Sequence, residues 1–577
     1  MTKNLLKASF TLFLLSHSHL LYAKPIIFST IVIDKSKEYK SRTISMNSPE
    51  YDYSTSVEEY LGFFSNIDLR KRASNGLQQD ISIRGSTFQD NIININGVDI
   101  SDPQTGHYSL EIPFTKYDIE TINIEPNTNT INLNIKKPSS KGVYFEHTCG
   151  EHALFNDIIS LNFAVKNIRN RLSYEHKISK GAKQDNDFKI HNLSFFSFWE
   201  KENNKINFIF ATTQRDFGAD SFYSSAFPQE EEHINQKIFI LETETKEKYF
   251  SLKNKIFLRR HEDKFILERH DPSFYTNYHT TYKYGYQTLL SFKNVSFSFG
   301  INKEKITSTN LGNHTRYKKD LQVILKNSFG KVDYNVNLTQ SYYGRFGWLN
   351  TTSVTTDYIL HEKAIIHLIF ANLWRPPSFT ELYYESPANQ GDNKLKVQKS
   401  KAWEISLDYK VSDNFDLKTG VFLRKQSNTI DWIKKNSTAV WQVANIGKIS
   451  SKGIDSSVNI TFRNSLIKRF ILNYTYLNID GENPYYASKY AFSYAKHKVC
   501  GIFVMEIKGF TVNWALSFLN PVDRKKYCVF NIKISKPVGN NLSIFLTVDN
   551  IFNTDYEPLK GINGEDRWCK WGITLHF

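Results

Sequence analysis

Regular alternation of apolar and polar residues restricts this chain more than any other feature. Residues 403–411 alternate in this way, a Ser412-Asp413-Asn414 turn follows, and residues 415–423 alternate again. Successive side chains of a β-strand point to opposite faces, so each arm has one apolar and one polar face. Each arm also approaches the roughly 9 to 11 residues with which a tilted strand crosses a bilayer. The pattern predicts an antiparallel hairpin of a transmembrane β-barrel.

The C-terminal residues repeat this pattern. Trp571, Ile573, Leu575 and Phe577 share one strand face, and the sequence ends on the aromatic residue. An unpaired strand edge is not tolerated in lipid. We therefore expect this strand to close the barrel against its first strand, and the edge strand of a soluble β-sandwich is the alternative.

Aromatic content and charge fit the same interpretation. Phe, Tyr and Trp make up 15% of the chain, and aromatic side chains gather where lipid meets water. The formal net charge is +15, a value also found in nucleic-acid-binding proteins. However, Lys and Arg are scattered among acidic and aromatic residues, without a zinc-finger or helix-turn-helix pattern. We expect a polar lumen and loops that face anionic lipid or ligand, and no nucleic-acid partner.

The first residues read as an export signal. Lys3 and Lys7 flank an apolar stretch over residues 8–21, and Leu21-Tyr22-Ala23 resembles a cleavage site. The stretch is too short to span a bilayer comfortably as a helix, and no later apolar run reaches about 18 residues. Residues 1–23 are therefore predicted to be a signal peptide.

Residues 24–140 have a different pattern from the rest. Residues 24–50 are predicted to be a periplasmic N-terminal segment, and residues 51–140 a small α+β domain. Within that domain, residues 56–59 resemble a capping box before a short amphipathic helix. Short alternating strands follow, and Asn96-Gly97 predicts a tight hairpin because both residues tolerate positive φ. We place a domain boundary at 140, with the barrel over residues 141–577.

Several segments, in this order along the chain, resemble the TonB-dependent outer-membrane receptors. Within that family they are most similar to the cobalamin (vitamin B12) receptor branch of Bacteroidetes-type bacteria. The similar segments are SVEEYLGFFSNIDL, DISIRG, IININGVDI and DPQTGHYSLEIP before residue 141, and FGADSFYS, RRHEDKFILERHDPSFYTNYH, RPPSFTELYY, NIGKISSKGID and DNIFNTDYE after it.

The resemblance implies a barrel of about 22 antiparallel strands with the small domain inside it as a plug. It also implies uptake driven by the periplasmic TonB protein across the outer membrane of a Gram-negative bacterium. The ligand would be cobalamin or another corrinoid, with a siderophore or heme as the alternative. Outer-membrane lipids are expected around the barrel, and a surface lipoprotein is a further partner of such receptors.

Particular residues take on roles through this resemblance. Thr30, Ile31, Val32 and Ile33 match the box that TonB grasps, where an extended segment can add itself to a partner as a strand; the first strand of the plug is the alternative. Arg84, beside Gly85, would pair with acids on the barrel wall, and Asn96 and Gly97 form the plug hairpin. The expected ligand contacts are Phe88, Gln89, Asp90, Asn91, Asp102, Gln104, His107, Asp216, Asp220 and Tyr223.

One departure from the family concerns the plug. The family continues after this point with a glycine-rich block, whereas here residues 126–130 alone join Glu125 to Ile131. The plug is therefore expected to be shortened, and a passive or leaky barrel becomes an alternative function. Asp216 and Asp220 could order loops by binding calcium, and the metal content stays open.

Catalysis is not expected. The chain lacks the G-x-S-x-G and H-E-x-x-H patterns, and His261-Glu262-Asp263 is interpreted as part of a loop in a family-like segment. We expect no cofactor. The four cysteines have no C-x-x-C spacing, and their spacing alone does not establish a bridge between Cys528 and Cys569.

Overall fold

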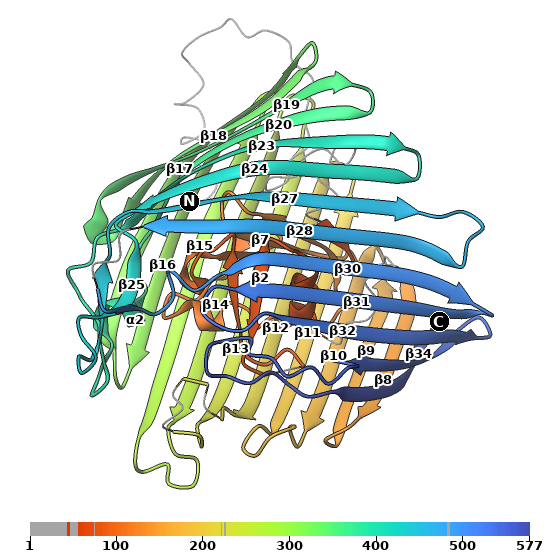
Figure 1. Ribbon diagram of the computed structural model, residues 1–577. Helices are drawn as coiled ribbons and strands as arrows, with labels where there is room; N and C mark the ends of the chain where they lie inside the picture. The colour runs from red at the N-terminus through yellow and green to blue at the C-terminus, as the bar shows by residue number, and fades with distance from the viewer. Residues whose placement is uncertain (1–42, 47–55, 74, 221, 224–226, 482–484) are drawn as a thin grey trace, which may run out of the picture.

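The computed structural model describes residues 43–46, 56–73, 75–220, 222–223, 227–481 and 485–577. The predicted signal peptide and the segment Thr30–Ile33 lie outside these residues. The chain forms a closed barrel of 22 antiparallel strands around a small N-terminal domain (Figure 1). The expected fold class, a plugged β-barrel of about 22 strands, is confirmed.

The barrel strands follow one another as neighbours around the wall. They are β8 (Lys141–Gly150), β9 (Leu154–Val165), β10 (Ile168–Ser179), β11 (Phe188–Lys201), β12 (Asn204–Gly218), β13 (Glu231–Lys246), β14 (Ser251–Ile266), β15 (Thr276–Ser291), β16 (Val295–Ser308), β17 (Gly312–Phe329), β18 (Val332–Tyr343), β19 (Trp348–His361), β20 (Ala364–Arg375), β23 (Gln398–Ser412), β24 (Phe415–Ser427), β27 (Ile449–Thr461), β28 (Ile467–Gly481), β30 (Ala495–Ile507), β31 (Phe510–Pro521), β32 (Tyr527–Val538), β33 (Leu542–Asp549) and β34 (Trp568–His576).

The last strand closes the barrel. β34 pairs antiparallel with β8, and Leu575 lies opposite Phe145. Phe577 extends the ladder by one residue, because its N–H donates to the carbonyl of Val143 at 3.0 Å and its carbonyl accepts from Val143 at 3.1 Å. The closure leaves neither strand edge unpaired, as a barrel in lipid requires.

The two ends of the barrel differ in their connections. At the end where β8 begins, strands are joined by short turns such as 166–167, 202–203 and 330–331. At the other end the connections include 376–397 and 428–448. We call these the turn end and the loop end. In outer-membrane barrels short turns face the periplasm and long loops face outward.

Secondary structure within the loops forms a cap at the loop end. None of the helices in the described part of the chain is long and apolar enough to cross a membrane. A second five-stranded sheet has the order β21-β22-β26-β25-β29. The loop elements are η6 (Gly344–Phe346), α2 (Phe379–Tyr383), β21 (Glu385–Ser386), β22 (Asn389–Gln390), β25 (Ile430–Lys434), β26 (Trp441–Asn445) and β29 (Ala487–Ser488).

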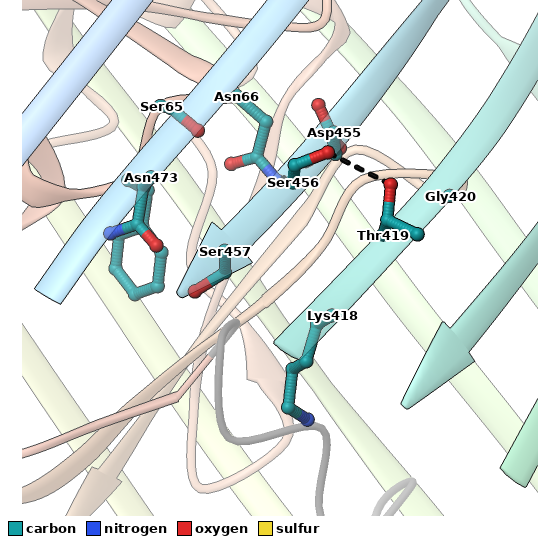
Figure 2. Close-up of a pocket in the computed structure, with 10 residues that line it drawn as sticks. Ser65, Asn66, Lys418, Thr419, Gly420, Asp455, Ser456, Ser457 and Asn473 are labelled. Carbon is teal, nitrogen blue, oxygen red and sulfur yellow. Dashed lines mark hydrogen bonds between the residues drawn. The ribbon is translucent and has the colours of Figure 1, made fainter. Parts of the chain in front are cut away.

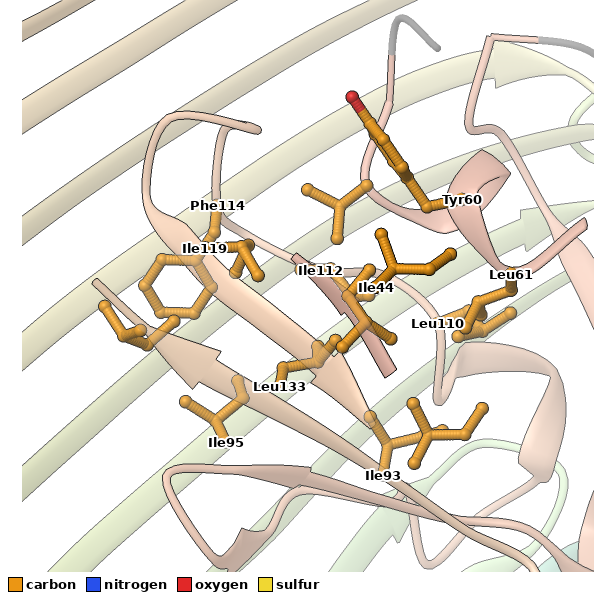
Figure 3. Packing of buried hydrophobic residues seen from close by; sticks show 14 of the residues in the cluster. Ile44, Tyr60, Leu61, Ile93, Ile95, Leu110, Ile112, Phe114, Ile119 and Leu133 are labelled. Carbon is orange, nitrogen blue, oxygen red and sulfur yellow. The ribbon is translucent and has the colours of Figure 1, made fainter. Parts of the chain in front are cut away.

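The plug is a small mixed domain built around a five-stranded sheet of order β1-β6-β7-β4-β5 and a β2–β3 hairpin. Its apolar side chains, among them Ile44, Leu61, Ile93 and Leu133, gather in one buried cluster (Figure 3). The plug elements are β1 (Thr43–Ser45), η3 (Glu58–Phe63), β2 (Ile67–Lys71), β3 (Gln79–Ile83), η4 (Phe88–Asp90), β4 (Ile92–Ile95), β5 (Val98–Asp99), η5 (Gly106–Tyr108), β6 (Ile119–Glu125) and β7 (Thr130–Ile135).

Two local predictions for the plug have different outcomes. Asn96 and Gly97 both have positive φ, 46° and 75°, and join β4 to β5 as a tight hairpin. The predicted capping box is wrong, because η3 is a 3₁₀ helix that starts after Val57 and has no side-chain cap. Glu59, the expected partner of the cap, lies 3.5 Å from Lys71 instead.

The segment that departs from the family is a simple hairpin. β6 and β7 pair antiparallel, and residues 126–129 connect them. Asn129 takes a positive φ of 52° in this turn. The connection therefore contains no further element, and it faces the wall strand β24, where Arg424 donates to the carbonyl of Pro126 at 2.7 Å.

Candidate functional site

Two of the surfaces through which the plug meets the barrel wall differ in chemistry. On the first, inward-facing apolar residues join the core cluster of the plug, and we call this surface the apolar arc. Its members come from β11–β14 and from β28, β30 and β31. They are Phe196, Phe198, Ile209, Ala211, Ile238, Ile240, Phe257, Ile471, Ile502, Val504 and Ala515.

The second surface, formed by the inward faces of β15–β20, β23, β24 and β27, is polar, and we call it the polar arc. A cavity of about 460 Å³ lies between it and the plug. The plug side contributes Gln89, Asp90, Asn91 and Asp102 among others. The wall side of the cavity includes Lys283, Gln287, Asn302, Glu304, Arg316, Lys318, Asp320, Gln322, Thr339, Ser341, Thr351, Trp374, Arg375 and Gln398.

Arg84 forms an ionic link between the plug and two strands of the polar arc. It adopts a positive φ of 49°, a conformation that L-residues rarely take, and Gly85 follows with a φ of 75°. This backbone directs the guanidinium to the wall, where Nη1 lies 2.9 Å from Glu404 and Nε donates to Asp455 at 2.8 Å. The guanidinium carbon also lies 3.9 Å from the centre of the Phe422 ring. A buried charge is tolerated when it is paired in this way.

A small pocket adjoins this link. It has a volume of about 30 Å³ and lies between plug residues 64–66 and the strands β24, β27 and β28. Figure 2 shows Asn66 and Asp455 on one side and Lys418 on the other, with a hydrogen bond of 2.8 Å between Thr419 and Ser456. The volume and polar lining suit a water molecule, so the contact here is polar and open to hydration.

At the loop end of the plug, a polar cluster forms its apex. The carboxylate of Asp80 lies 2.8 Å from Arg72 and 2.6 Å from Nδ1 of His107. Burial alone would raise the pKa of Asp80, but His107 and Arg72 hold it well below its usual range. Phe88 stacks on the His107 ring at 3.9 Å, and the Tyr223 ring lies 5.2 Å from Arg72.

The loops are hydrogen-bonded to this apex. Phe379 donates its N–H to the carbonyl of Pro103 at 3.0 Å, and Thr380 donates to Gln104 at 3.1 Å, so α2 is bonded to the plug backbone. Arg375, just before α2, lies 2.9 Å from Asp90. A ligand that enters from the loop end would therefore meet α2 and the apex as one closed surface.

A second loop contact involves a buried carboxylate. Asp431 in β25 accepts backbone hydrogen bonds from Tyr490 at 3.2 Å and from Ala491 at 3.1 Å. Burial raises the pKa of Asp431 to about 6, although these hydrogen bonds oppose the shift. The Tyr490 ring meets Phe88 of the plug edge-on at 4.9 Å. The loop sheet and the apex are therefore in contact.

Sequence reasoning did not find the ionic cluster around Asp102. Arg259 forms an ion pair with Asp102, and His261 lies 2.7 Å from Glu111. The interpretation of His261-Glu262-Asp263 as part of a loop is wrong, because these residues belong to β14. The alternation in RRHEDK could have revealed this cluster, because it places Arg259 and His261 on the same face of one strand, and that face looks into the lumen.

The expected ligand contacts fall into four groups. Phe88, Asn91, Asp102 and Gln104 are buried, and Gln89, Asp90, His107 and Tyr223 are partly exposed. Asp220 lies in the connection 219–230. Asp216 lies on the outer face of β12, where it pairs with His233 at 2.8 Å. Because that face looks away from the lumen, Asp216 is not part of the proposed ligand site.

The sequence leaves metal binding and cysteine pairing open, and the acidic, histidine and cysteine side chains in the described part of the chain bear on both. No group of three or more His, Cys, Asp or Glu side chains there could hold a metal ion. Asp216 and Asp220 therefore do not form a calcium site with other described acids. All four cysteines lie within the described residues and are free thiols, including Cys528 and Cys569.

A plug inside a closed 22-stranded barrel, joined to it by buried ion pairs, is the architecture of a plugged outer-membrane receptor. The family model "TonB dependent receptor-like, beta-barrel" matches residues 153–551. The chain belongs to this family. Comparison with curated proteins gave no match.

Solved structures with the same fold include a siderophore receptor, a ferric-catecholate import receptor and an iron transporter. The siderophore receptor PirA of Pseudomonas aeruginosa is 12% identical with a TM-score of 0.73, over 93% of this chain and 98% of that one. The ferric-catecholate import receptor Fiu of E. coli K12 is 14% identical, with a TM-score of 0.72, and 93% and 96% covered. The FrpB iron transporter of Neisseria meningitidis is 13% identical, with a TM-score of 0.74, and 93% and 99% covered. At such identities the similarity establishes the fold alone.

Proposed function

We propose that this protein takes up a large, scarce ligand across the outer membrane of a Gram-negative bacterium, driven by a TonB-type protein in the periplasm. The observation that carries this proposal is the Arg84 link to Glu404 and Asp455. An ionic link of this kind can be replaced by water when the plug moves, unlike a dry apolar contact. It holds the plug in place at rest and permits rearrangement under load.

The position of β1 supports a pulling mechanism. β1 is an edge strand of the plug sheet, and in the part of the chain that the structure describes it pairs antiparallel with β6 through three residue pairs, from Thr43 to Ser45. The proposed TonB box, Thr30–Ile33, precedes it in the chain. A partner that binds this box by strand addition would transmit force to β1 first and separate it from β6 one pair at a time.

Corrinoid is the ligand that we propose first. The sequence resemblance to the cobalamin branch points to it, and Gln89, Asp90 and Trp374 line the cavity, where they could meet amides and an extended ring. A ferric siderophore is the second candidate, favoured by Arg316 and Lys318 on the same cavity, whose present partners are Glu304 and Asp320. Such cations attract an anionic chelate.

Uptake and binding can be separated with one substitution. Ile31→Pro removes a backbone donor from the proposed box, so uptake should fall to background while ligand binding to cells stays unchanged. Ser36→Pro, outside the box, is the matched control and should transport normally. Unchanged uptake by Ile31→Pro would contradict energised transport through this segment.

The ligand class needs a direct titration. Purified protein should be titrated with cyanocobalamin, a ferric catecholate siderophore and heme, with tryptophan fluorescence as the measurement. Saturable binding of cyanocobalamin that weakens severalfold in Gln89→Ala supports a corrinoid. Saturation by the siderophore alone would favour the second candidate, and saturation by none of the three would contradict both.

A further inference from the structure

Cationic and tyrosine side chains collect on the outer face of the barrel over β13–β17, where the plug mechanism makes no use of them. Neighbouring residues show which face they occupy: Arg259 and His261 are buried toward the lumen, while the Arg260 side chain between them is 36% exposed. We call this group the rim patch. Its members are Lys237, Arg260, Lys264, Lys303, Lys305 and Lys319, with Tyr278, Tyr282, Tyr284 and Tyr317.

The register of the strands makes the rim patch continuous. Lys237 lies opposite Arg260, Arg260 opposite Tyr282, and Tyr282 opposite Lys305. On the neighbouring row, Lys303 lies between Tyr284 and Tyr317 on the two adjacent strands. Directly opposite residues lie about 4.5 to 5.5 Å apart. Cations from successive strands can therefore act on one bound group.

The patch lies at the boundary of the lipid-facing surface. One step toward the turn end, the outward side chains of the same strands are apolar and exposed, among them Leu258, Ile256, Phe297 and Leu321. The cations come one step nearer the loop end. A row of cations and tyrosines beside an apolar band marks the level of lipid headgroups, and on a barrel whose loops face outward this is the outer leaflet.

The cations of the patch are largely uncompensated. Arg260 pairs with Glu262, but none of the five lysines has an ion pair with another residue in the part of the chain that the structure describes. Lys303 instead lies 5.8 Å from the ring centre of Tyr284 and 5.3 Å from that of Tyr317. These rings hold the ammonium group near the headgroup level without neutralising it, so the patch keeps a net positive charge.

We propose that the rim patch binds the phosphate groups of a phosphorylated glycolipid in the outer leaflet. Arg260 would supply a planar pair of donors to phosphate, and Lys303 and Lys305 would add point charges on the next strand but one. The acyl chains would lie along the apolar band below. The assignment to the outer leaflet rests on the proposed function, because that function sets which end of the barrel faces outward.

The test is lipid binding by the purified full-length protein in detergent micelles, measured by native mass spectrometry. The probes are a phosphorylated lipid A-type glycolipid, the same glycolipid without phosphates, and inorganic phosphate. The phosphorylated glycolipid should bind saturably, the dephosphorylated form at least tenfold more weakly, and inorganic phosphate should not compete at equal concentration. Binding that does not depend on the phosphates would overturn the proposal.

A triple variant and its matched control locate the site. Each cation near a charged membrane surface contributes a factor of roughly five in affinity, so Arg260→Gln, Lys303→Gln and Lys305→Gln together should weaken binding on the order of one hundredfold. Lys399→Gln, Lys401→Gln and Lys425→Gln remove equal charge from exposed rim positions on β23 and β24 and should change affinity less than twofold. Equal losses in both variants, or none in the first, would overturn the assignment.

Failure of this proposal and failure of the proposed function can be told apart. Lipid binding is measured without TonB or transported ligand, so it does not depend on uptake. Heat-modifiable migration in gel electrophoresis shows whether each variant has a folded barrel. A folded triple variant that retains full lipid binding contradicts the rim patch alone, whereas unchanged uptake in Ile31→Pro contradicts the proposed function alone.

Discussion

The apolar arc and the polar arc hold the same plug in opposite ways. On β11–β14 the wall presents Ile238, Ile240 and neighbouring buried apolar side chains to the plug core, beside the ion pair of Arg259 with Asp102. On β15–β24 it presents Ser341, Thr351 and similar groups to a cavity of about 460 Å³. Separating the first surface exposes apolar area at roughly 25 cal/mol per Å². Separating the second exchanges hydrogen bonds with water.

The comparison indicates which side opens. A load applied through β1 meets little apolar contact along the polar arc, so the plug should detach there first and stay attached along the apolar arc. The ligand path would then run beside β15–β20, where the resting cavity already lies. Four predictions test this difference, in order of decreasing effect.

Removing Arg84 should have the largest effect. Arg84→Ala leaves Glu404 and Asp455 without their main cation, and breaking a buried pair costs about 3–5 kcal/mol. The urea concentration at which plug release opens a conductance in planar bilayers should fall accordingly. Arg84→Lys keeps the charge without the planar fork. Its urea midpoint should therefore lie between those of the unsubstituted protein and Arg84→Ala. An unchanged midpoint for Arg84→Ala would show that the Arg84 link does not hold the plug.

The apolar arc can be probed with two adjacent residues of β13. Ile240→Ala removes a buried contact with the plug cluster and should destabilise the plug by roughly 2–5 kcal/mol in the same measurement. Leu241→Ala, on the opposite face of the strand, meets lipid and should leave plug release unchanged. Equal effects of the two substitutions would contradict the packing of β13 on the plug.

Water access should differ between the arcs at rest. In a cysteine-free background, Ser353→Cys on β19 should react with a water-soluble maleimide on the order of one hundredfold faster than Ala211→Cys on β12. Ala211 is fully buried against the plug, whereas Ser353 is partly exposed, and modification of a buried site requires local opening. Similar labelling rates at the two positions would contradict the expected difference in water access between the arcs.

The smallest effect concerns pH at the loop cap. The folded pKa of Asp431, about 6, lies above its ordinary value of 3.8. Its contribution to stability is therefore fully present below about pH 3.8 and is lost as pH rises through about 6. Amides of Tyr490 and Ala491 should exchange severalfold faster at pH 7.5 than at pH 5, after correction for intrinsic rates.

Two controls accompany the pH experiment. Asp431→Asn should abolish the pH dependence of exchange at Tyr490 and Ala491. Amides of plug strands packed on the apolar arc, such as Ile93, should show none. If Asp431→Asn kept the full pH dependence, the buried carboxylate would not be its cause.

Much of the barrel was predictable from the sequence, because alternation is a local property. Residues 403–411 and 415–423 form neighbouring strands with the predicted turn between them. The apolar arc also left a local signal, since residues 238–241 are apolar on both faces of one strand. A strand has apolar residues on both faces when lipid covers one face and the plug covers the other.

The site depended on contacts that no local pattern reveals. Arg84 meets Glu404 and Asp455, which lie more than 300 positions further along the chain. Asp216 was misplaced because alternation alone does not say which face of β12 looks into the lumen. The capping box predicted at Ser56 is wrong for a similar reason, because its expected glutamate, Glu59, lies against Lys71 instead.

The direct passage from β7 into β8 has a consequence for repeated use of the receptor. Residues 136–140 join the plug covalently to the wall, so a plug drawn out of the lumen stays attached to the barrel by a short linker. Its return is an intramolecular search, with an effective concentration in the millimolar range for a short linker. The plug therefore returns to the barrel of its own chain. Each transport cycle can end in the starting state without exchange of plugs between molecules.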